Sequence, residues 1–106
     1  MASALVNVPE RARRGEIVEI KALIAHPMET GYRRTQLGER IPRDIVRRLV
    51  CTYNGAEVVR VELHPAIAAN PFFSFSTVAT ESGTIEFHWT GDNGFTATES
   101  AAIVVE

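Results

Sequence analysis

The residues in this sequence that could bind a metal ion or act as a nucleophile are few and scattered: His26, Met28, Cys51, His64 and His88. A blue-copper site combines two histidines, a cysteine and a weak methionine ligand. In copper-binding sandwiches the cysteine, the second histidine and the methionine usually cluster late in the chain. Here Met28 lies far upstream of Cys51, and His64 follows Cys51 at a distance. The spacing argues against copper, and we expect neither a bound metal nor another cofactor.

Cys51 could also act as a reactive thiol, but reactivity requires exposure and a lowered pKa. It lies in the middle of an expected strand, on the same face as Leu49 and Tyr53. Free cysteine is often a small buried hydrophobe. We favour that interpretation of Cys51 and keep a thiol-active or metal-binding β-sandwich as the alternative.

The rest of the sequence offers no arrangement typical of an active site. It shows no Ser-His-Asp triad, paired carboxylates or phosphate-binding loop, so we do not expect an enzyme. A net charge of −2 argues against binding to nucleic acid or to a membrane surface. No stretch reaches the length of a transmembrane helix, and the N-terminus does not resemble a secretory signal. By elimination, the sequence predicts a binding or scaffold module.

Hydrophobic alternation predicts the elements that would hold these residues. The Asn54-Gly55 pair between two apolar runs indicates a hairpin with a type I′ turn, which would place Val58 opposite Cys51. Alternation slips near 99–100, where a β-bulge could form. No segment predicts a helix, so we expect one domain over residues 1–106, an all-β, immunoglobulin-like antiparallel β-sandwich of about seven strands. The expected strands are 4–8, 16–25, 45–53, 56–63, 72–80, 84–90 and 95–105.

Two segments do not fit regular strands. The loop 26–43 contains four arginines beside Met28, Tyr32 and Leu37, a composition typical of protein interfaces, although a solvated loop explains it equally well. The segment 64–73 is apolar but contains two prolines, which exclude a regular helix or a central strand.

These same segments carry a family resemblance. The stretch 24–33, Ile-Ala-His-Pro-Met-Glu-Thr-Gly-Tyr-Arg, resembles the signature loop of the SoxZ family of the bacterial thiosulfate-oxidising (Sox) system. The same family is matched by 41–43, by the hairpin 51–55, by 63–72 and by 82–84 leading to Trp89. The resemblance covers nearly the whole chain.

The resemblance implies a partner and a cellular location. SoxZ proteins are immunoglobulin-like sandwiches that form a heterodimer with SoxY, and SoxY carries covalent sulfur intermediates on the cysteine of a mobile C-terminal tail. This chain ends in an expected strand and has no such tail, so the resemblance implies the non-catalytic, non-carrier subunit. It would make transient contact with other Sox enzymes in the periplasm, exported together with SoxY because it has no signal peptide of its own.

We expect the two irregular segments to contact SoxY or a visiting enzyme, since both combine apolar residues or arginine with irregular backbone. An equally good interpretation of Ile67 and Phe72 is that they plug the end of the sandwich. An isolated subunit with an unpaired apolar patch could also form a homodimer. The candidate contact residues are Met28, Tyr32, Arg33, Ile67, Pro71 and Phe72.

Overall fold

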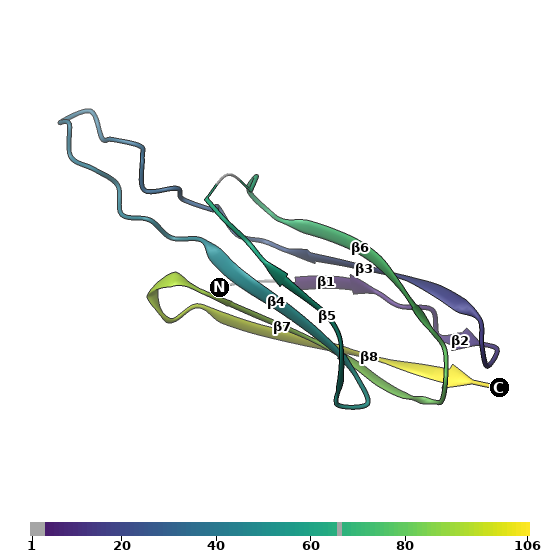
Figure 1. Ribbon diagram of the computed structural model, residues 1–106. Coiled ribbons are helices and arrows are strands. Elements are labelled where there is room, and N and C mark those ends of the chain that lie inside the picture. Colours follow the sequence, from purple (N-terminus) through teal and green to yellow (C-terminus); the bar gives the residue numbers. More distant parts are fainter. Residues whose placement is uncertain (1–3, 66) are drawn as a thin grey trace.

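The computed structural model describes residues 4–65 and 67–106 and folds them into two packed β-sheets (Figure 1). The smaller sheet has the order β1-β3-β6, formed by Ala4–Asn7, Ile17–Ile24 and Phe72–Val78. The larger sheet has the order β2-β8-β7-β4-β5, formed by Arg11–Ala12, Thr96–Val105, Gly83–Gly91, Val46–Tyr53 and Ala56–Glu62. Within the described ranges, a single 3₁₀ turn, η1 (Asp92–Gly94), is the only helical element. The predicted all-β, immunoglobulin-like sandwich is confirmed.

The core lies between the two sheets and follows the alternation in the sequence. Alternate residues of β3 and β7 point inward and are almost fully buried. The rings of Phe87 and Trp89 stack with their centroids 6.0 Å apart. The inward residues of these two strands are Val18, Ile20, Ala22, Ile24, Ile85, Phe87 and Trp89.

The hairpin between β4 and β5 has the predicted turn but a different register. Asn54 and Gly55 both have positive φ, 49° and 84°, as a type I′ turn requires. The pairing then shifts, so that Cys51 lies opposite Val59 and Val58 becomes the extra residue of a β-bulge. The predicted pairing of Cys51 with Val58 is wrong because a strict two-residue register does not continue past the turn.

Two further details differ from the predictions. Residues 11–12 form the short strand β2, parallel to the end of β8, where no strand was expected. The bulge predicted near 99–100 is absent, since β7 and β8 pair without a shift from Gly83 to Thr90. Phe87 pairs directly with Glu99, so a polar residue interrupts the hydrophobic alternation of β8 without changing the register.

Tyr53 joins β4 to the turn before β7. Its ring is buried, its hydroxyl donates to the carbonyl oxygen of Glu81, and the Glu81 N–H lies 3.3 Å from the same hydroxyl. We expect Tyr53→Phe to lower the free energy of unfolding by about 1–2 kcal/mol, because the partly buried backbone groups of Glu81 lose their partner. Urea denaturation measures the change. Tyr32→Phe is the matched control, since Tyr32 is exposed and should give no change; equal effects of the two substitutions would contradict this role for the Tyr53 hydroxyl.

In the part of the chain that the structure describes, no helix has the length and apolar character needed to cross a membrane.

Candidate partner-binding site

Residues 25–45, here called the arm, connect β3 to β4 and extend beyond the sheets as an irregular hairpin (Figure 1). Its two sides are joined by backbone hydrogen bonds. Glu29 and Asp44 exchange two of 2.8 Å, and the Ile41 N–H donates to the Arg33 carbonyl over 2.9 Å. The long dimension of the molecule is 60 Å, against 20 and 18 Å for the others. The loop 26–43, whose sequence lacks clear periodicity, therefore forms a projecting hairpin.

The base of the arm joins the two segments that the sequence singled out. The His26 N–H donates to Oδ1 of Asn70 over 2.9 Å, and the Asn70 N–H donates to the His26 carbonyl over 2.7 Å. These bonds fix the arm against the chain that leads from β5 to β6. The buried His26 ring also lies edge-on against Phe95, with the ring centroids 4.8 Å apart.

Met28 belongs to this base and not to the surface. Its side chain is only 4% exposed, and its sulfur accepts a hydrogen bond of 3.2 Å from the Val46 N–H. Its own N–H donates to Nδ1 of His26 over 3.0 Å, with φ at 53°. The expectation that Met28 touches a partner is therefore corrected: burial makes it an anchor of the arm.

Two of the four arm arginines are held by carboxylates. Nε of Arg33 lies 3.0 Å from Oε2 of Glu29, and this hydrogen bond lowers the pKa of the Glu29 carboxyl. Nε of Arg43 lies 2.8 Å from Oδ2 of Asp92, beside η1. Burial alone would raise the pKa of Asp92, but hydrogen bonds from Arg43 and the Ile45 backbone lower it overall. These ion pairs hold the Arg33 and Arg43 side chains in place.

The remaining candidate contact residues lie on more than one surface. Tyr32 lies on the outer part of the arm and is 78% exposed, and Arg33 follows it. Ile67 is partly exposed on the connection before β6, whereas Pro71 is buried. Phe72 is 56% exposed, so it does not plug the end of the sandwich. The structure places these residues near one end of the molecule without gathering them into one cluster.

Phe72 belongs to an exposed apolar row that the sequence analysis did not identify. Leu5 of β1 pairs with Leu23 of β3, and Leu23 pairs with Phe72 of β6. We call Leu5, Leu23 and Phe72 the apolar rung. Together with Asn7 and Lys21 it lines a groove of about 380 Å³ on the outer face of the smaller sheet. The sequence contains a signal for this row, because β1, β3 and β6 each have a large apolar residue on the face opposite the core.

Cys51 is completely buried in the core. Burial raises the pKa of its thiol from 9.0 to about 11. Both facts disfavour a reactive thiolate, because the thiolate is the nucleophile and needs access.

We expect the folded protein to resist alkylation of Cys51 at pH 8, with full labelling after denaturation. The raised pKa also predicts loss of stability as the pH rises from about 9 to about 11, because the unfolded chain releases the thiol proton first. Denaturation at several pH values, compared with Cys51→Ala, isolates this contribution. Rapid labelling of the native protein would restore the thiol-active alternative.

The other candidate ligands lie apart. His26 is at the arm base, His64 follows β5, and His88 is on the outer face of the larger sheet. Across residues 4–65 and 67–106, no three His, Cys, Asp or Glu side chains come together in a way that could hold a metal ion.

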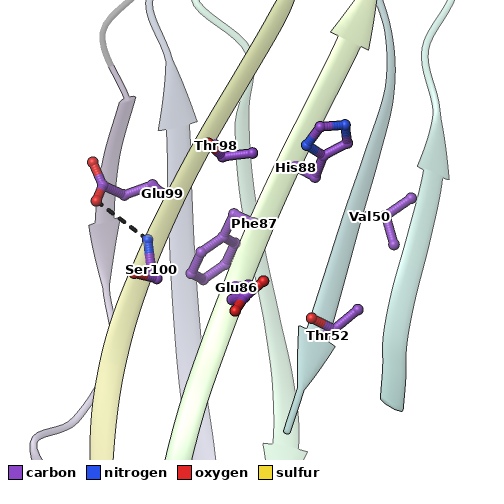
Figure 2. Close-up of a pocket in the computed structure, with 8 residues that line it drawn as sticks. All are labelled: Val50, Thr52, Glu86, Phe87, His88, Thr98, Glu99 and Ser100. Carbon is purple, nitrogen blue, oxygen red and sulfur yellow. Dashed lines mark hydrogen bonds between the residues drawn. The ribbon is translucent and has the colours of Figure 1, made fainter. Parts of the chain in front are cut away.

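The outer face of the larger sheet has a hollow of about 400 Å³ over β4, β7 and β8 (Figure 2). Its floor is formed by two cross-strand rows, Val50-His88-Thr98 and Thr52-Glu86-Ser100. Figure 2 shows Glu99 set apart at its edge, where the carboxylate accepts a hydrogen bond of 3.2 Å from the Ser100 N–H. This polar hollow does not bring a nucleophile and a base into contact, and the arm end of the molecule is the better candidate for function.

A family model described as the sulphur oxidation protein SoxZ matches residues 6–102. The chain belongs to the SoxZ family. The match includes the arm, the apolar rung apart from Leu5, and both rows of the polar hollow. No curated protein sequence matches this SoxZ-family chain significantly.

Solved structures share the fold at low sequence identity. Superoxide reductase (neelaredoxin) from Ignicoccus hospitalis has a TM-score of 0.76 at 16% identity, over 98% of this chain and 80% of that one. The sulfur carrier protein SoxY from Chlorobium limicola f. thiosulfatophilum has a TM-score of 0.68 at 12% identity, over 97% and 78%. The CARDB domain of a Pyrococcus furiosus protein has a TM-score of 0.52 at 13% identity, over 100% and 94%. At these identities the likeness concerns the fold alone.

Proposed function

We propose that this chain is the non-catalytic partner subunit of a SoxYZ carrier complex. It would form a heterodimer with SoxY, which bears the covalent sulfur intermediates during thiosulfate and sulfur oxidation. The observation that carries the proposal is the SoxZ family match over residues 6–102. We further propose that the complex acts in the periplasm, after export together with SoxY.

The apolar rung is the surface that we assign to SoxY. It offers three large apolar side chains in a row on the outer face of a sheet, and such exposed patches mark interaction sites. Lys21 and Asn7 border the groove, so an apolar centre has polar groups at its edge, as stable interfaces do. In the isolated chain the same rung would support self-association at high concentration.

Light scattering after size exclusion, on the chain alone and mixed with SoxY, tests the proposal. We expect a one-to-one complex at micromolar concentration, with any self-association of the isolated chain displaced by SoxY. If the chain elutes separately from SoxY at every concentration, the carrier-complex assignment fails.

A further inference from the structure

The end of the arm is a small, well-defined structure. The Gly38 N–H donates to the Thr35 carbonyl over 2.9 Å, and the Thr35 N–H donates to the Glu39 carbonyl over 2.8 Å. Gly38 has φ at 84°, which closes this turn in the way that three-residue hairpin loops do. The Thr35 hydroxyl oxygen also accepts a hydrogen bond of 3.2 Å from the Glu39 N–H. The tip, residues 32–40, is thus shaped before any partner binds.

Two arginines face each other across this tip. Arg34 and Arg40 form an antiparallel bridge, so their side chains project from the same face of the hairpin. Like charges directly opposite each other are destabilising. Among the described residues, neither arginine forms an ion pair, unlike Arg33 and Arg43. Arg34 uses Nη1 to donate to the Gly38 carbonyl over 2.9 Å, which holds one guanidinium in place.

Apolar surface lies beside this arginine pair. Tyr32 and Leu37 are 78% and 88% exposed, and both lie within the tip. Arginine and tyrosine are enriched among the residues that dominate binding energy at protein interfaces. A planar guanidinium binds a carboxylate through two parallel hydrogen bonds, and such a carboxylate would also relieve the repulsion between the two arginines.

We propose that the arm tip binds an acidic, partly apolar surface on a protein other than SoxY. A carboxylate of that protein lies between Arg34 and Arg40, and its apolar residues pack against Tyr32 and Leu37. This assignment rests on the proposed function in one respect, that SoxY occupies the apolar rung. The arm extends past the sheet that carries the rung, so a third protein can reach the tip while SoxY is bound (Figure 1).

A protein surface fits this tip better than nucleic acid or an anionic membrane. Both of those ligands require many cations in an extended patch, because binding strength follows the number of phosphates neutralised. The arm itself carries Glu29, Glu39 and Asp44, and the chain as a whole has a net charge of −2.

The test uses the double variant Arg34→Glu/Arg40→Glu in the chain alone and in its mixture with SoxY. The control is Arg13→Glu/Arg14→Glu, which makes the same charge change in the turn before β3, at the opposite end of that strand from the arm. The probes are the purified enzymes of the same thiosulfate-oxidising system, followed by biolayer interferometry at 50 and 300 mM NaCl. We expect the arm variant to lose at least tenfold in affinity for one enzyme, the control to change less than twofold, and the wild-type affinity to fall with salt.

The outcomes separate this proposal from the proposed function. Equal binding by wild type and arm variant, or equal loss in both variants, would overturn the tip assignment while leaving the SoxY complex intact. Loss of SoxY pairing in the arm variant alone would make the tip part of the SoxY interface and would also overturn it. Tighter binding of the wild type to duplex DNA or to phosphatidylglycerol vesicles than to any of the enzymes would also overturn the tip assignment. Failure of the wild-type chain to pair with SoxY would reject the proposed function. The tip assignment would then be decided by the binding of the isolated chain and its variants to the enzymes.

Discussion

Replacement of Phe72 by glutamate is expected to weaken pairing with SoxY by about 30- to 1,000-fold, the range for a residue at the centre of an interface. Phe72 is the end of the apolar rung and is already more than half exposed in the free chain. A carboxylate at this position would be removed from water when the partner binds, which costs free energy unless a cation meets it. Titration calorimetry or interferometry with SoxY measures the loss.

The control for this variant is Val78→Glu, at the other end of the same strand. Val78 is 46% exposed and shares the outer face of β6 with Phe72, so the two variants make the same kind of change on the same sheet. The free energy of unfolding of both variants should stay within about 0.5 kcal/mol of the wild-type value, as is usual for surface substitutions. If Phe72→Glu pairs normally while Val78→Glu does not, the interface lies at the opposite end of the sheet from the rung. If neither affects pairing, this face is not the one that SoxY binds.

Trp89→Ala is expected to destabilise the fold by about 3–5 kcal/mol, the usual cost of removing a large aromatic side chain from a core. Trp89 is completely buried and stacks on Phe87. Small domains have a total stability of about 5–15 kcal/mol, so much of the margin would be lost. The melting temperature should fall by about 15–30 °C, which calorimetry or circular dichroism would show.

Trp89→Phe separates packing from hydrogen bonding at the same position. The indole N–H of Trp89 is buried without a hydrogen-bond partner in the described part of the chain. Replacing it by phenylalanine removes an unsatisfied donor together with some volume, so we expect a loss of only about 1–2 kcal/mol. If Trp89→Phe were as damaging as Trp89→Ala, the indole N–H would have to make a stabilising contact that the structure does not contain.

All the strands except β2 could be predicted, because each of them has one face packed on the core. Ile85, Phe87 and Trp89 alternate with polar residues in the sequence, and the structure buries all three. The Asn54-Gly55 turn could also be predicted, since few residue pairs other than Asn-Gly adopt positive φ at both central positions of a type I′ turn. In these cases local sequence and tertiary packing favour the same structure.

The arm and its base could not be predicted in the same way. Met28 looked like an interface residue, but its burial depends on Val46 and on His26, whose own position depends on the distant Asn70. The bulge at Val58 likewise follows from pairing between whole strands and not from the residues of the turn. The apolar rung needs the order of three strands that are far apart in sequence, because Leu5, Leu23 and Phe72 become neighbours only in the sheet.

The buried position of Cys51 has a consequence for sulfur chemistry. It is the single cysteine of the chain, and its thiol is completely inaccessible in the folded protein. In a complex of the proposed kind, this subunit would offer no site for persulfide exchange or for mixed disulfides. The carrier thiol of the partner would then meet no competing thiol from this chain, and an electrophilic probe added to the intact complex would label the partner without background from this chain.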